Sequence, residues 1–307
     1  MTPARRLGYT LLILSVFLGG LEMLGRLLPS NDNRTGFAAH PDRGWTLPRS
    51  ASLDFFGVPA QTNHLGLRSP EPVEQPSLRV VVLGDSTAFG HGVGDEETFS
   101  AQLALRTGAD VQNAGVPGYT CLQSADRYHD IVAALLPDIL VVYTLHNDVR
   151  KLDSEDEIWV NRAAVWGIMR LLTTAQRWLR VRRGESRVSL SQYRRCLSGL
   201  AARQQEHGGQ TLVISPFDRR HLDARFEERR AHGKGHQRPY RAVLAALAEQ
   251  PGITLLDLTD TTWAGEESVE VLMLDAVHPA AAGHQRIAAQ IEDSLAVAGV
   301  QWPQDGG

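Results

Sequence analysis

Residues 78–91 read Leu-Arg-Val-Val-Val-Leu-Gly-Asp-Ser-Thr-Ala-Phe-Gly-His. The first half is an apolar, β-branched run, which predicts a strand buried on both faces of a sheet. The second half is small, polar and punctuated by glycine, so the strand leads into a turn that carries Ser86. Open α/β sheets bind their ligands at the carboxyl ends of their strands. Ser86 is therefore a candidate nucleophile, provided that the chain also supplies a base.

Predicted strands alternate with predicted helices from residue 78 onward. The strands are expected at residues 79–83, 111–116, 138–145, 211–215 and 253–258. The helices are expected at residues 95–106, with Asp95 as the N-cap, and at 122–136, 240–249 and 280–298. Such alternation is typical of a parallel sheet with helices on both faces. The predicted fold class is α/β, with three α/β/α layers around a central parallel sheet.

The amino terminus predicts a transmembrane helix. Arg5 and Arg6 precede an apolar run, and residues 7–28 would form about 33 Å of helix, enough to cross a bilayer core. Glu22 and Arg26 lie near its outer end, where they can pair or reach the interface. An uncleaved signal anchor is expected; a cleaved signal peptide or a soluble protein with an apolar helix are the alternatives. The basic residues before the span predict a single-pass protein of the plasma (inner) membrane, with a cytoplasmic amino terminus and an extracytoplasmic domain.

Four segments are expected along the chain. They are a signal anchor at 1–28, a tether and small β-rich flap at 29–77, an α/β domain at 78–300 and a tail at 301–307. Asn63 and Arg68 in the flap are expected to fix turns rather than to touch substrate.

An insertion at 153–187 mixes tryptophans with arginines and predicts one or two basic amphipathic helices. A helix packed on the domain is the plain interpretation; a lid over the site and a membrane-surface helix are the alternatives. Residues 218–238 are rich in Arg, His and Glu and are expected to form a solvated excursion. His221, His232 and His236 show no regular ligand spacing, so no metal site is expected.

The composition is that of a globular protein, with 43% apolar residues among 307 and a formal net charge of −4. Without a basic excess, a nucleic-acid partner is not expected. Cys121 and Cys196 are too few for a disulfide framework. Two buried thiols are the expected state, and one disulfide is the alternative if the domain is exported.

A serine hydroxyl is a poor nucleophile unless a base takes its proton and a third group orients that base. Residues 274–279 read Leu-Asp-Ala-Val-His-Pro, just before the last predicted helix. Asp275 and His278 are three residues apart, so in a turn the carboxylate can accept a hydrogen bond from one imidazole nitrogen while the other faces outward. His278 is therefore the candidate base, and Asp275 is its partner.

Acyl transfer also needs hydrogen-bond donors aimed at the oxyanion of its tetrahedral intermediate. Gly115 follows a predicted strand and, lacking a side chain, lets its N–H approach an oxygen closely. Asn147 follows the strongest predicted strand and offers a side-chain N–H₂. Because the carboxyl ends of parallel strands open on one edge of the sheet, Ser86, Gly115 and Asn147 are expected to converge.

These motifs, in this order, resemble the four blocks of SGNH hydrolases, also called the GDSL esterase/lipase family. The blocks here are Gly84-Asp85-Ser86, Gly115, Asn147-Asp148 and Asp275-Ala-Val-His278. The resemblance covers residues 78–298 and implies a flavodoxin-like fold, with Ser86 as nucleophile, His278 as general base and Asp275 as its partner. It also implies an oxyanion hole built from the N–H groups of Ser86 and Gly115 and the side chain of Asn147.

The chain departs from the family pattern at one position: the third block usually has Gly two residues before its Asn, and here that residue is Leu145. The membrane anchor and the segments Gly44-Trp45 and Asn63-x-x-Gly-x-Arg68 are similar to those of anchored bacterial members.

The predicted function is a serine esterase or deacylase that cleaves a small-molecule, lipid or glycan ester through an acyl-enzyme, without a cofactor. An O-acyltransferase with the same triad is the close alternative, since the sequence does not distinguish water from an alcohol as acyl acceptor. A nucleotide-binding module built on residues 84–87 would leave Asp275 and His278 without a role. A catalytically silent anchored scaffold is the remaining alternative.

Overall fold

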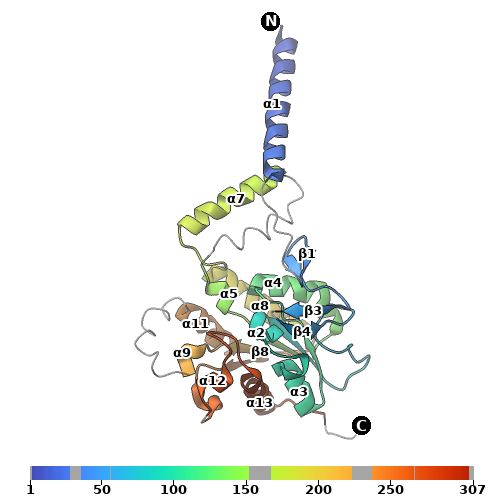
Figure 1. Ribbon diagram of the computed structural model, residues 1–307, viewed down its shortest axis with the longest axis vertical. Coiled ribbons are helices and arrows are strands. Elements are labelled where there is room, and N and C mark those ends of the chain that lie inside the picture. Colours follow the sequence, from blue (N-terminus) through green and yellow to red (C-terminus); the bar gives the residue numbers. More distant parts are fainter. Residues whose placement is uncertain are drawn as a thin grey trace. The chain divides into compact units, whose positions relative to one another are not determined.

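The computed structural model of the chain is drawn in Figure 1 and describes residues 2–27, 36–55, 57–151, 167–222, 237–265 and 267–303. Most of the predicted tether, the first part of the predicted insertion and most of the polar excursion, including His232 and His236, lie outside these residues. The chain divides into two compact units. One comprises Met1–Thr46 with Lys151–Glu185, and the other comprises Leu47–Arg150 with Ser186–Gly307.

Among its described residues, the first unit holds two helices and a small hairpin. Its helices are α1 (Pro3–Arg26) and α7 (Gly167–Arg182), and its hairpin pairs β1 (Ala38–His40) with β2 (Gly44–Thr46). Within the part of the chain that the structure describes, one helix, Arg5–Arg26, is long and apolar enough to cross a membrane. Residues 167–182 form a single helix of the kind predicted for the insertion.

The second unit is built on a five-stranded parallel sheet. Its strands are β5 (Arg79–Gly84), β6 (Asp110–Asn113), β7 (Ile139–Tyr143), β8 (Gln210–Ser215) and β9 (Ile253–Asp257). They lie in the order β6-β5-β7-β8-β9. With β5 taken as the first strand, this is the flavodoxin-like order 2-1-3-4-5. The predicted α/β class with a central parallel sheet is confirmed.

Helices cover both faces of this sheet. They are needed because β5 has apolar side chains on each face and all of them are buried. Val80 and Val82 face a core formed with α3 (Phe99–Thr107) and α13 (Ala281–Val297). Val81 and Leu83 face a second core formed with α4 (Cys121–Arg127), α8 (Leu190–Glu206) and α11 (Arg238–Leu247). Along a strand that is buried on both faces, apolar residues do not alternate with polar ones. This explains the unbroken apolar run from which β5 was predicted.

Two predicted helices differ in detail from those observed, and one helix of 17 residues was not predicted. Asp95 begins a 3₁₀ turn, Asp95–Glu97, and the N-cap of α3 is Thr98, whose hydroxyl accepts the Ala101 N–H at 3.2 Å. The helix expected at 122–136 is regular only over α4, continuing as a π turn over Tyr128–Val132 and a 3₁₀ turn over Ala133–Leu135. The unpredicted helix is α8.

Residues 47–55 and 57–70 form turns and one hairpin, β3 (Ser52–Phe55) with β4 (Val58–Gln61), as expected for this part of the flap. Asn63 fixes a turn, because its Oδ1 accepts the N–H groups of Leu65 and Leu67. Arg68 is buried and holds the loop after α2 (Ser86–Phe89), donating to Gly90 O and Val93 O at 2.7 Å each.

Candidate active site

The nucleophile turn lies where β5 ends and α2 begins. Asp85 caps α2 by accepting the Thr87 N–H at 2.9 Å, and Ser86 is the first helical residue. Gly84 is required by packing, since a Cβ at this position would stand 2.1 Å from the carbonyl oxygen of Tyr143 on β7. Strand β5 has β6 on one side and β7 on the other, so Ser86 occupies the topological switch point at which doubly wound sheets bind ligands.

His278 connects Ser86 to Asp275. Its Nε2 lies 2.8 Å from Ser86 Oγ, and its Nδ1 lies 2.7 Å from Asp275 Oδ2. An ionised carboxylate only accepts hydrogen bonds, so Nδ1–H donates to Asp275 and, in the neutral ring, Nε2 accepts from the Ser86 hydroxyl. The three residues predicted to act together are therefore joined in one hydrogen-bond chain.

Asp275 is held by its own loop rather than by burial, and its side chain is 51% exposed. Its Oδ1 accepts the backbone N–H groups of Val277 and His278, each at 2.8 Å. Partial burial raises the pKa of Asp275, but the hydrogen bonds from His278 and from the Val277 N–H outweigh it and leave the pKa below its ordinary value. The lowered pKa keeps the Asp275 carboxylate ionised, so it can orient the His278 imidazole.

The two predicted oxyanion donors lie beside the nucleophile turn, and both have protein acceptors. The Gly115 N–H donates to Asn113 Oδ1 at 3.0 Å, and a Cβ on Gly115 would collide with α2, 2.5 Å from Phe89 N. Asn147 Nδ2 donates to Tyr119 O at 3.1 Å and, at a longer 3.4 Å, to Asp85 Oδ2. Both donors therefore reach the end of β5, and the contact from Asn147 to Asp85 is the weakest bond that either makes.

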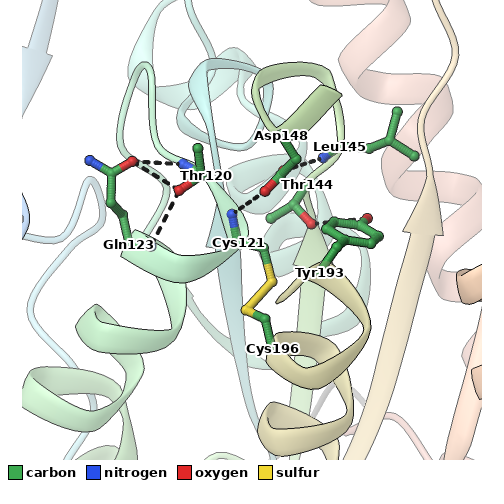
Figure 2. Close-up of a disulfide and its surroundings, with 8 residues drawn as sticks. All are labelled: Thr120, Cys121, Gln123, Thr144, Leu145, Asp148, Tyr193 and Cys196. Atoms are coloured by element: carbon green, nitrogen blue, oxygen red, sulfur yellow. Dashed lines mark hydrogen bonds between the residues drawn. A yellow bond between two sulfur atoms is a disulfide. The ribbon is translucent and has the colours of Figure 1, made fainter. Parts of the chain in front are cut away.

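Asp148 received no role from the sequence, yet it organises the loop that carries Asn147. Its Oδ2 accepts the Leu145 N–H at 3.1 Å, and its Oδ1 accepts the Cys121 N–H at the start of α4 at 2.8 Å. Figure 2 shows this carboxylate bridging the two segments directly above the disulfide between Cys121 and Cys196. The expectation of two buried thiols was wrong: α4 and α8 pack side by side on one face of the sheet, which brings the two cysteines together.

Two buried carboxyl groups lie behind the nucleophile. Burial raises the pKa of Asp85 to about 7, the Thr87 N–H opposes this rise, and the neighbouring Asp148 adds to it. Burial likewise raises the pKa of Asp148 to about 6, against the hydrogen bond from the Cys121 N–H. Ionisation of either Asp85 or Asp148 therefore costs free energy, because the two carboxyl groups are neighbours and both are buried away from water.

The sequence signature and the geometry agree with a known family. The model of the GDSL-like lipase/acylhydrolase family matches residues 82–286, which is more than half of the chain. The chain belongs to this family. The match begins within β5 and ends in α13, so it includes the nucleophile turn, both oxyanion candidates and the Asp275–His278 loop. No curated protein gave a significant match.

Solved structures with this GDSL fold include an acetyl xylan esterase, AlAXEase, with a TM-score of 0.51 and 16% identity over 71% of this chain and all (100%) of that one. LAE5, an alpha/beta hydrolase enzyme from the metagenome of Lake Arreo, Spain, has a TM-score of 0.49 and 22% identity over 72% of this chain and 95% of that one. A catalytic variant of Axe2, an acetylxylan esterase from Geobacillus stearothermophilus, has a TM-score of 0.48 and 18% identity over 75% and 98%. At these identities the likeness concerns the fold.

Leu145 occupies the position where the GDSL pattern usually has glycine, and its backbone adopts φ +134°, in the region that favours glycine. Its side chain is fully buried, and its N–H is fixed by Asp148. The departure in sequence is therefore accommodated by backbone strain, and the loop keeps the shape that presents Asn147.

Two further histidines lie at the GDSL site. The centroids of the His91 and His278 rings are 4.4 Å apart and the rings are tilted by 39°, and the partly buried His146 shares the Asn147 turn, its Nε2–H donating to Phe217 O at 3.0 Å. A histidine after the Ser86 helix is visible in the sequence, but no spacing rule marks it as a neighbour of His278. No group of three or more His, Cys, Asp or Glu among the described residues is arranged to hold a metal ion.

Proposed function

We propose that this protein is a membrane-anchored serine esterase or deacylase that removes acyl groups from the hydroxyls of a carbohydrate or lipid. The observation that carries the proposal is the hydrogen-bond chain from Asp275 through His278 to Ser86, with links of 2.7 and 2.8 Å at the switch point of the sheet. Acyl transfer needs a nucleophile, a base and an orienting group in this relation.

The reaction follows from the roles of these groups. Ser86 Oγ attacks the ester carbonyl carbon while its proton passes to His278 Nε2, and Asp275 stabilises the imidazolium that forms. Collapse of the tetrahedral intermediate breaks the bond to the alcohol oxygen, which takes the proton back from Nε2, and leaves Ser86 acylated. Water then attacks the acyl-enzyme with His278 again as base, releasing the carboxylic acid and restoring Ser86.

Charge on the oxyanion would be stabilised by three donors at the end of β5. The Ser86 N–H is the first of α2, a position with no intrahelical acceptor. The Gly115 N–H and the Asn147 amide supply the others. The oxyanion would take the place of Asp85 as acceptor for Asn147, because the 3.4 Å contact is the easiest to exchange.

The place of action follows from two other features. The Arg5–Arg26 helix has the length of a bilayer crossing, and the arginines before it favour a cytoplasmic amino terminus. The Cys121–Cys196 disulfide supports an oxidising compartment for the second unit, since structural disulfides persist outside the reducing cytosol. Both the apolar helix and the disulfide fit a single-pass protein of the plasma membrane with an extracytoplasmic catalytic domain.

Labelling with a fluorophosphonate probe tests the proposal. The wild-type protein is expected to label, and Ser86→Ala is expected not to label and to lose ester hydrolysis. Equal labelling of both proteins would show that Ser86 is not the nucleophile, and no labelling of either would favour a silent scaffold. Product analysis with a radiolabelled acyl donor then distinguishes water from an alcohol as acceptor.

A further inference from the structure

Helix α7 has the composition of a helix that lies on a membrane. Residues 167–183 carry five arginines and no acidic residue. Apolar residues recur at helical spacing along one stripe, namely Ile168, Leu171, Leu172, Ala175, Trp178 and Leu179. Leu172, Trp178 and Leu179 are 53%, 51% and 47% exposed. A single helix with a large apolar face in water and a basic remainder matches the pattern of interfacial helices.

The amino terminus of α7 is fixed to the carboxyl-terminal end of α1. The Glu22 carboxylate accepts the Ile168 N–H at 3.1 Å and the Arg26 Nε–H at 2.8 Å. The two backbones touch at Gly25 and Gly167, where a Cβ on either residue would overlap the other helix. Small residues allow this close approach of helices, as they do in membrane-spanning pairs.

This junction sets the depth of α7. Charged side chains such as Glu22 and Arg26 at the end of a spanning helix reach the headgroup region. Ile168 is hydrogen-bonded to Glu22, so α7 begins at the same depth. An amphipathic helix that begins at the membrane surface buries its apolar stripe most directly by lying along that surface.

We propose that α7 is an interfacial helix that binds anionic lipid, with its apolar stripe at the boundary of headgroups and acyl chains and Arg182 on lipid phosphates. The proposal rests on the membrane anchor proposed above. Trp178 suits this boundary because indole rings prefer the interface. The Arg182 guanidinium, 4.1 Å from the centre of the Trp178 ring, is placed to meet phosphate at the same level.

Site-directed spin labels on the full-length protein test the depth of α7. The protein is reconstituted in nanodiscs of phosphatidylcholine and phosphatidylglycerol, with one added cysteine in each of three variants: Val16→Cys in α1, Ala175→Cys on the apolar stripe and Thr173→Cys. Positions 173 and 175 lie on roughly opposite sides of a helix with 3.6 residues per turn, so they are matched controls. The readout is collision with oxygen, which dissolves in lipid, against collision with a water-soluble nickel chelate.

The expected result is a several-fold higher ratio of oxygen to nickel collisions at Ala175→Cys than at Thr173→Cys, with Val16→Cys highest. Equal exposure of positions 173 and 175 to nickel would place α7 in water and overturn the proposal. Equal protection of both from nickel and oxygen would mean that protein covers the helix, which also overturns it. If Val16→Cys is open to nickel, the membrane anchor itself fails, and this result is distinct from the other two.

A second inference concerns His91, and the contact between the His91 and His278 rings carries it independently of α7. The hydrogen bonds at Nδ1 and Nε2 hold the His278 ring at two points, which leaves rotation about the line joining them. The His91 ring lies on one face of His278, at 4.4 Å and 39°, and opposes that rotation. The His91 N–H donates to Ser86 O at 3.0 Å, and buried Arg68 holds the adjacent carbonyl of Gly90.

We infer that His91 is a positioning residue that keeps the His278 imidazole aimed at Ser86, an inference that rests on the proposed role of His278. Its ring is kept neutral, because burial and the neighbouring His278 both lower the pKa of His91. A neutral aromatic face also favours the imidazolium that forms when His278 takes the serine proton.

Ring replacement tests this role. His91→Leu is expected to lower kcat about 3- to 10-fold with KM unchanged, the range of a lost aromatic pair, whereas His91→Phe retains kcat within about 2-fold. The rate of fluorophosphonate labelling is expected to follow kcat, while the melting temperatures of both variants stay close to wild type. Unchanged kcat in His91→Leu, or equal losses in both variants, would overturn the inference. If His278→Ala retains activity, the catalytic proposal fails instead.

Discussion

The two halves of the candidate site are built in opposite ways. The nucleophile side grows out of the core: residues 80–83 of β5 have no exposed surface, and Asp85 and Thr87 are 1% exposed. The base side is a surface loop closed by its own bonds, with Met273 bridged to Pro279 and the Leu274 N–H donating to His278 O at 2.9 Å.

This difference separates stability from chemistry. A change on the nucleophile side disturbs buried, fully packed groups, so it is expected to alter folding and activity together. A change on the base side removes a side chain from an exposed loop that keeps its backbone hydrogen bonds, so it is expected to alter activity far more than stability. Each of the following variants tests that division.

The largest effect is expected on the base side, from His278→Ala. Loss of the base leaves the Ser86 hydroxyl without a proton acceptor, and kcat/KM should fall by about 10⁴-fold or more. The melting temperature should stay within a few degrees of wild type because the backbone bonds of the loop remain. Hydrolysis of p-nitrophenyl acetate and thermal unfolding measure the two quantities. His129→Ala, an exposed histidine on the π turn, is the control and should keep full activity.

Asn147→Ala tests the nucleophile side. Loss of one oxyanion donor is expected to lower kcat by about 10²- to 10³-fold with little change in KM. The melting temperature should also fall, because the carbonyl of Tyr119 loses its donor in a buried place. A decrease in kcat below about 3-fold would mean that Asn147 does not contact the oxyanion.

Asp275→Ala is expected to have a smaller effect than a buried triad carboxylate. Removing such a buried group costs about 10⁴-fold, but the Asp275 side chain is half exposed, so solvent screens its interaction with the imidazolium. A decrease of about 10²-fold in kcat fits the comparison. The melting temperature should fall only slightly, because the Val277 and His278 N–H groups lose the Asp275 acceptor in an exposed loop. A loss as large as that of His278→Ala would show that the exposed loop closes over the site during turnover.

The difference between the two sides also governs what could be predicted from the sequence. Strands that are buried on both faces, such as β5 and β7, appear in the sequence as unbroken apolar runs rich in β-branched residues. A strand end followed by Gly, Asp and Ser indicates the candidate nucleophile. The candidate base was predicted from its chemistry, since Asp275 and His278 are close in sequence. Their distance from Ser86 was not predictable by local pattern, because 192 residues separate Ser86 from His278.

Other features depend on packing that no local pattern carries. The Cys121–Cys196 disulfide requires α4 and α8 to be neighbours, although the two cysteines are 75 residues apart. Helix α8 itself has a readable signal, a capping box between Ser189 and Gln192 and apolar residues at helical spacing, but frequent Arg and Gln residues obscure it. The positive φ of Leu145 runs against the preference of leucine, so only the structure reveals it.

The last effect, expected from Asp85→Asn, is on stability rather than on rate, and it depends on pH. The pKa of Asp85 is about 7 in the folded protein, well above the ordinary value of 3.8. Between these values the folded state keeps a proton that the unfolded state has lost, so this group makes stability fall as pH rises. The slope is at most about 1.4 kcal/mol per pH unit, and the loss is complete above the folded pKa.

Asparagine does not titrate, so the difference in unfolding free energy between Asp85→Asn and wild type should move in favour of the variant from about pH 4 to 7. The partly buried His146 and the fully buried His284, whose pKa values desolvation lowers to about 4 and 3, make stability rise with pH in the acid range. They are present in both proteins and cancel in the difference. Urea unfolding at three pH values measures it, with the exposed Asp293→Asn as control. A difference that stays constant with pH would mean that Asp85 does not keep its proton in the folded protein. The nucleophile side would then lack the free-energy cost of ionising a buried carboxyl group, which distinguishes it from the base side.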